Sequence, residues 1–129
     1  MRKYLLSPDK NTYKANLHAH TNISDGKLSP EELKNLYKAN GYSVLAYTDH
    51  DVLIPHNELS DNEFLALSGF EAQFNGSNKY PGISNEKKCH ICFISGKSEG
   101  AEQPCWKEEY AYIIYLRLDA WFGQFIFVC

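Results

Sequence analysis

Four of the five histidines stand where they could share a metal ion with a carboxylate. His18 and His20 are two residues apart, so in an extended strand both imidazoles point to the same face and can bind one ion. The same spacing also occurs in pairs of solvent-facing histidines at a strand end. Asp25 follows in a short loop that can fold back onto the pair.

Three further donors occur downstream, each within or at the end of an apolar run: His50, Glu71 and His90. The Glu71 carboxylate can bridge two cations, which a neutral imidazole cannot do. Mixed nitrogen and oxygen ligands suit zinc, manganese or iron, and the sequence does not choose among these ions. We therefore predict a multinuclear metal site built from His18, His20, Asp25, His50, Glu71 and His90.

Three other polar residues are candidates for roles around the metal or the substrate. Asp49 and Asp51 flank His50, and strand alternation points them away from it. We expect them to orient a ligand imidazole or to hydrogen-bond a loop rather than to bind metal directly. His56 follows a proline and could contact a substrate phosphate, although a surface position is the more ordinary interpretation.

The four cysteines, Cys89, Cys92, Cys105 and Cys129, crowd the last third of the chain and leave the first 88 residues without a crosslink. This distribution is unlike a secreted disulfide scaffold, so we predict reduced thiols. Cys89 and Cys92 have a spacing seen in zinc ribbons, but in a strand they face opposite sides and no second such pair occurs. Buried thiols are the favoured interpretation.

A helix is predicted to begin after Ser29, with proline at the first helical position and two acidic residues in the first turn. Leu33, Leu36 and Tyr37, together with Asn40, share one face of it. Gly41 is placed to end the helix.

Strands are predicted over residues 13–20, 43–48, 64–71 and 88–94, with a loop over 75–86. The second of these is a nearly continuous apolar run, as in a parallel strand covered on both faces. Strands separated by helical or loop crossovers indicate an α/β fold, in which side chains at the carboxyl ends of parallel strands converge on one site. The predicted ligands lie at such positions.

Four motifs resemble those of the polymerase and histidinol phosphatase (PHP) superfamily. They are His18-Ala19-His20-Thr21 with Ser24-Asp25-Gly26, Thr48-Asp49-His50-Asp51, Glu71, and His90, within residues 14–95. The resemblance implies a metal-dependent phosphoesterase on a distorted (β/α)7 barrel, with up to three divalent ions. It implies Glu71 as the bridging ligand, and Glu71 and His50 as catalytic residues.

The resemblance covers roughly the first half of such a barrel, because an ordinary eight-unit barrel needs upwards of ~200 residues. The family's later ligands have no counterpart after His90. We therefore expect either a phosphoesterase acting on a phosphomonoester or nucleotide, or a non-catalytic metal-binding fragment of such an enzyme. An amidohydrolase-like hydrolase, which also begins with a histidine-x-histidine strand, fits the later motifs less well.

We divide the chain into a PHP-like domain over residues 1–109 and an apolar tail over residues 110–129, which forms extra strands or is an end that was never selected to pack. An open half-barrel leaves an unpaired edge strand, which the apolar tail could either cover or make sticky. We expect self-association through that edge and the tail.

The chain is 43% hydrophobic and carries a formal net charge of -3 at pH 7. This charge argues against a general nucleic-acid surface, which needs a surplus of Lys and Arg. The amino-terminal apolar run is too short for a signal peptide, and Arg117 and Asp119 interrupt the apolar tail. We expect a cytoplasmic protein with a small phosphorylated partner and no membrane association.

Overall fold

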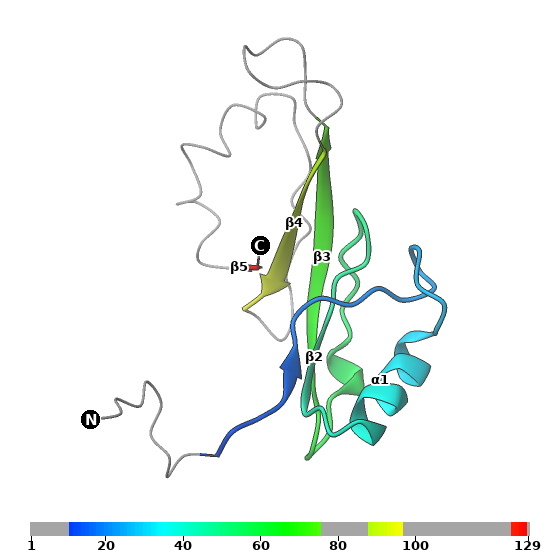
Figure 1. Ribbon diagram of the computed structural model, residues 1–129, viewed down its shortest axis with the longest axis vertical. Helices are drawn as coiled ribbons and strands as arrows, with labels where there is room; N and C mark the ends of the chain where they lie inside the picture. Colours follow the sequence, from blue (N-terminus) through cyan, green and yellow to red (C-terminus); the bar gives the residue numbers. More distant parts are fainter. Residues whose placement is uncertain (1–10, 76–87, 97–124, 129) are drawn as a thin grey trace, which may run out of the picture.

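The computed structural model describes residues 11–75, 88–96 and 125–128, which form a mixed α/β fold around one five-stranded sheet. In chain order the elements are β1 (Ala15–Asn16), α1 (Pro30–Ala39), β2 (Val44–Tyr47), the 3-10 helix η1 (Asn57–Leu59), β3 (Leu65–Asn75), β4 (Lys88–Ser95) and β5 (Phe125–Val128). Figure 1 shows α1 lying beside one end of the sheet, with the long strand β3 running through its middle.

The sheet has a parallel half and an antiparallel half. Strands β1, β2 and β3 are parallel, whereas β4 runs antiparallel to β3 and β5 antiparallel to β4. The strand predicted over residues 88–94 is confirmed as β4, but it returns along β3 instead of continuing the parallel order. The convergence of strand ends that the sequence predicts therefore applies to the parallel half alone.

Helix α1 forms as its end signals predict. The Ser29 hydroxyl accepts a hydrogen bond from the Glu32 backbone N–H at 3.3 Å, and the Glu32 carboxylate accepts one from the Ser29 N–H at 2.9 Å. Gly41 follows with φ of 77°, the left-handed conformation that glycine adopts readily after a helix. The predicted apolar face is narrower than expected, because Leu33 and Tyr37 reach the core while Leu36 is 49% exposed.

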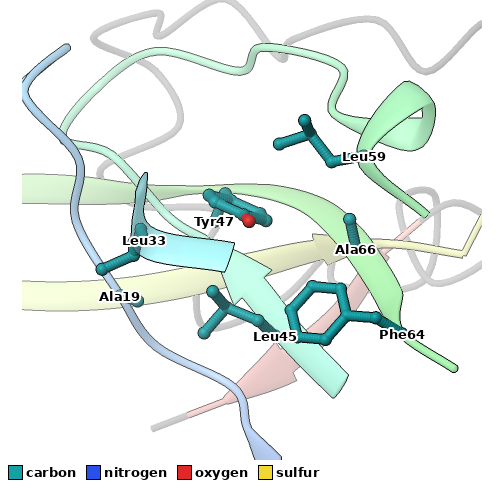
Figure 2. Close-up of a cluster of buried hydrophobic side chains, with 7 residues drawn as sticks. All are labelled: Ala19, Leu33, Leu45, Tyr47, Leu59, Phe64 and Ala66. Carbon is teal, nitrogen blue, oxygen red and sulfur yellow. The ribbon is translucent and has the colours of Figure 1, made fainter. Parts of the chain in front are cut away.

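The main hydrophobic core lies between α1 and the parallel strands, and Figure 2 shows its seven buried side chains converging. They are Ala19, Leu33, Leu45, Tyr47, Leu59, Phe64 and Ala66. Burial raises the pKa of Tyr47, whose hydroxyl donates a hydrogen bond to the Pro30 carbonyl at 3.2 Å. This bond ties β2 to the first turn of the helix.

The first strand is much shorter than the predicted residues 13–20. It pairs with β2 only at two positions, the second of which joins Asn16 to Leu45. Beyond it the contact with Thr48 is only partly a backbone ladder. The Thr48 N–H donates to the Ala19 carbonyl at 2.8 Å, but the Ala19 N–H donates to the Thr48 hydroxyl at 3.2 Å instead of to a backbone carbonyl. His18 and His20 therefore lie on an irregular segment held by both backbone and side-chain hydrogen bonds.

Part of the apolar tail is a strand, since β5 pairs with β4 over four residues. The remaining tail residues and the predicted domain boundary at residue 109 lie outside the described ranges, as does most of the loop predicted over 75–86. Among the helices that the structure describes, none is long and apolar enough to cross a membrane.

Phe64→Ala is expected to lower the free energy of unfolding by about 3–5 kcal/mol, because the side chain is 2% exposed and its removal leaves a cavity. Leu36→Ala, on the exposed side of α1, is the matched control and should change the free energy by less than about 0.5 kcal/mol. Urea unfolding followed by circular dichroism measures both. Equal losses would contradict the assigned core.

Candidate metal centre

The structure brings all six predicted ligands together around the Glu71 carboxylate. Glu71 lies inside β3, not at the end of a strand as predicted, because β4 pairs with β3 from Gly69 onward. Its side chain is nearly buried, with 7% exposed. On one side its backbone forms a bridge with His50, and on the other it pairs with Cys92 of β4.

Each Glu71 carboxylate oxygen faces two imidazoles. Oε1 lies 3.1 Å from His90 Nδ1 and 3.9 Å from His18 Nε2. Oε2 lies 3.1 Å from His20 Nε2 and 3.2 Å from His50 Nδ1. The two oxygens thus separate the four histidines into two pairs.

The imidazole rings also contact one another in series. His18 and His20 have ring centroids 4.7 Å apart, His20 and His50 4.5 Å, and His50 and His90 5.4 Å, all edge to face. Desolvation by burial lowers the pKa of His18, and the neighbouring histidines lower it further against the attraction of Glu71. Both effects favour the neutral ring, which is the form that binds metal.

Asp25 contacts His20 and His50 through the ring nitrogens that face away from Glu71. Its Oδ1 lies 2.6 Å from His20 Nδ1, and its Oδ2 lies 3.5 Å from His50 Nε2. The hydrogen bond with His20 holds the pKa of this exposed carboxyl below its ordinary value. Asp25 therefore contributes a carboxylate at the solvent-facing edge of the cluster.

Hydrogen bonding alone does not satisfy this cluster. His20 faces a carboxylate oxygen with both ring nitrogens, and so does His50. A neutral imidazole has one N–H, so in each ring one lone pair points at a carboxylate unless the ring is charged. His20 Nε2 is buried and lies 3.1 Å from Glu71 Oε2, yet it makes no hydrogen bond. A cation removes the conflict, because it attracts the imidazole lone pair and the carboxylate alike.

Two groups of donor atoms among the described residues could hold a metal ion. One contains His20, His50 and Glu71, and the other contains His18, Glu71 and Cys92, with the donor atoms of each group within 4.8 Å of one another. Glu71 belongs to both groups, which is the arrangement that a bridging carboxylate needs.

Cys92 is the residue of this cluster that the sequence reasoning missed. Its Sγ lies 2.9 Å from His18 Nδ1, and the Thr48 hydroxyl oxygen lies 2.9 Å from the same nitrogen. The prediction of buried thiols is confirmed for Cys92, which is 7% exposed, whereas the side chain of Cys89 lies outside the described part of the chain. The signal was the spacing of Cys92 and His90, which lie two residues apart and so share a face of β4.

Asp49 positions the loop that carries Asp25. Its buried carboxylate accepts hydrogen bonds from the Thr21 N–H at 2.7 Å, the Thr21 hydroxyl at 2.9 Å and the Ser24 hydroxyl at 2.7 Å. Gly26 completes this loop, since a Cβ at that position would collide with the His20 carbonyl. Of the two roles that the sequence predicts for Asp49, the structure displays loop hydrogen bonding.

Asp51 forms hydrogen bonds with the β3 backbone at and beyond Glu71. It has φ of 55°, a left-handed conformation that aspartate tolerates better than most residues. Its N–H donates to the Glu71 carbonyl at 2.8 Å, and its carboxylate accepts from the Gln73 N–H at 3.1 Å. These two bonds align the second motif, residues 48–51, with β3.

The expectation of a surface position for His56 is wrong. The residue is 4% exposed, and its ring lies 4.6 Å from the Tyr47 ring. Its backbone N–H donates to the Ser68 hydroxyl at 2.8 Å, which draws the segment after Pro55 against β3. A proline-led loop suggested exposure, but this tertiary contact places His56 on Tyr47 of the core.

Comparisons with known proteins cover a small part of the chain. No family model matches it. A 5'-3' exoribonuclease of Haemophilus influenzae (strain ATCC 51907 / DSM 11121 / KW20 / Rd) is 50% identical over 42 residues, which amount to 33% of this chain and 15% of that protein. The matched segment is too short a part of the relative to assign its activity to this chain.

Asp49→Ala is expected to lower the free energy of unfolding by roughly 2–4 kcal/mol, because buried donors of Thr21 lose a charged acceptor. Asp51→Asn, which keeps a side-chain oxygen and suits the same backbone conformation, should change it by less than about 0.5 kcal/mol. Chemical unfolding of both variants measures the difference. A tolerant Asp49→Ala would show that the loop does not depend on this carboxylate.

Burial lowers the pKa of His56 below its ordinary value of 6.5, so the unfolded chain takes up a proton before the folded chain does. Stability should therefore fall as the pH drops from 6.5 towards the lower pKa of the folded state. His56→Gln should lose part of this acid sensitivity. Unfolding free energies between pH 7.5 and pH 5 test it, and parallel curves for the two proteins would rule out a His56 contribution.

Proposed function

We propose that this chain binds divalent metal ions through His18, His20, Asp25, His50, Glu71 and His90, and that it is a metal-dependent phosphoesterase of the PHP type. One observation carries the proposal: the buried Glu71 carboxylate has an imidazole nitrogen from each of four histidines within 4 Å. Proteins seldom bury a carboxylate among lone pairs unless a cation compensates it.

The donor set supports borderline or harder divalent ions, namely zinc, manganese or iron. On the Oε2 side of Glu71, the nitrogen donors belong to His20 and His50. The oxygen donors there belong to Glu71 and Asp25. Neutral imidazoles contribute no charge, so the carboxylates of Glu71 and Asp25 balance a divalent cation.

Bound divalent ions in such a site supply Lewis acidity that activates water and neutralises charge on phosphoryl oxygens. The residues of this chain fix where that chemistry takes place. Glu71 holds the centre because its backbone is locked between His50 and β4. Glu71 and His50 are the proposed catalytic residues, and Asp49 is a positioning residue that acts through the loop of Asp25.

The proposed substrate is a phosphomonoester or a nucleotide, including the end of an oligonucleotide. The Haemophilus relative is named for action on RNA ends, and its partial similarity makes an oligoribonucleotide a reasonable substrate to test. The net charge of -3 supports recognition of a local phosphate rather than of a long nucleic-acid backbone.

Glu71→Gln is expected to reduce bound manganese and zinc and to lower phosphate release by more than about 100-fold, because the amide is a poor bridging ligand. Glu63→Gln, on a carboxylate whose side chain is 82% exposed, is the matched control and should behave as the parent. Elemental analysis gives the metal content. Release of phosphate from a small phosphomonoester, and of phosphate or mononucleotides from a 5'-phosphorylated oligoribonucleotide, gives the activity.

Phosphate release that survives a chelator would contradict the proposal. Stoichiometric metal without turnover on either substrate would favour the alternative, a non-catalytic metal-binding protein with the same cluster.

A further inference from the structure

The Cys92 thiol lies inside the cluster that the proposed function assigns to metal. We propose that Cys92 is a direct metal ligand on the His18 side of Glu71, which makes that half of the site a mixed sulfur, nitrogen and oxygen site selective for zinc over manganese. This inference rests on the proposed function, since it adds a ligand to the same centre. It makes the two halves of the cluster chemically different.

The strand pairing places Cys92 at the centre. Cys92 is the direct antiparallel partner of Glu71, so both side chains leave the sheet on the same face. His90 lies two residues before Cys92 on β4 and shares this face. Three donors from two adjacent strands therefore converge before any loop contributes.

The distances suit one ion. Cys92 Sγ lies 2.9 Å from His18 Nδ1, and the donor atoms of His18, Glu71 and Cys92 all lie within 4.8 Å of one another. Around tetrahedral zinc, with ligand bonds of roughly 2.0–2.3 Å, neighbouring donors are about 3.5 Å apart. Because one His18 nitrogen binds the ion, the three donors reach it only after side-chain rotations that separate the close pair and draw in the third donor.

The two oxygens of Glu71 divide the centre. Oε1 faces His18 Nε2 and His90 Nδ1, and Cys92 contacts the other ring nitrogen of His18, Nδ1. Oε2 faces His20 and His50, with Asp25 beyond them. The first half thus contains a sulfur donor, and the second contains nitrogen and oxygen donors.

A sulfur donor changes which ion the first half prefers. Thiolate is a soft ligand that selects zinc, whereas manganese prefers oxygen. On binding, the Cys92 sulfur donates an electron pair to the cation and the thiol proton passes to solvent. The affinity of this half for zinc therefore rises with pH more steeply than imidazoles and carboxylates alone would require.

A lesser role is also compatible with the close contact, namely a thiol that hydrogen-bonds His18 Nδ1 and only orients the ring. The two roles differ in the spectrum of a bound cobalt ion. Direct ligation produces a thiolate-to-cobalt charge-transfer band in the near ultraviolet, and an orienting hydrogen bond does not.

The test is titration of the metal-free full chain with Co²⁺, alongside Cys92→Ser and a matched variant in which Cys89, Cys105 and Cys129 are all changed to Ser. The parent and the triple variant should show the charge-transfer band. Cys92→Ser should bind cobalt without it. Its zinc affinity should fall by more than about 100-fold, beyond the 10–100-fold typical of losing an orienting partner, while manganese affinity changes less than about tenfold.

Cobalt bound to the triple variant without a charge-transfer band would overturn the ligand role of Cys92 and leave the proposed function standing. If neither the parent nor the triple variant binds cobalt, zinc or manganese, both proposals fail. Because the triple variant keeps Cys92, the result does not depend on whether Cys92→Ser folds.

Discussion

The buried carboxylate of Glu71 is the constraint around which the described part of the molecule is organised. A carboxylate removed from water must be compensated, and among the described residues the groups nearest this one are imidazole nitrogens, not lysines or arginines. Imidazoles can compensate it by carrying charge or by sharing a cation with it. Several of these rings already face a second carboxylate or a thiol, so a shared cation satisfies more of the donors at once.

Three features of the fold bring side chains to the Glu71 carboxylate. Parallel pairing of β2 with β3 brings the segment after β2, which carries His50, alongside Glu71. Antiparallel pairing of β3 with β4 adds His90 and Cys92 on the same face. The loop of Asp25 depends on buried hydrogen bonds to Asp49. The core of α1, β2 and β3 supports all three, because it fixes the parallel strands from which the site extends.

Features set by residues close together in the sequence were predictable, and features set by contacts between distant residues were not. The ends of α1 were predictable because the capping serine, the proline and the terminal glycine act on their immediate neighbours. The existence of β2, β3 and β4 followed from their apolar composition. The first strand was overestimated, because alternation cannot reveal that the Ala19 N–H donates to the Thr48 hydroxyl instead of to a strand carbonyl. His56 was misplaced for a similar reason, since its burial depends on Tyr47 and Ser68.

The sequence by itself determined the types of the donors and the order in which the chain presents them: a histidine pair, an aspartate, a histidine after a strand, a glutamate and a last histidine. The tertiary structure decided that these donors meet at one carboxylate, that each Glu71 oxygen takes a different pair of histidines, and that Cys92 joins them. The reason is that strand direction and register are set by long-range pairing. A change of one residue in register would turn Cys92 to the opposite face of the sheet.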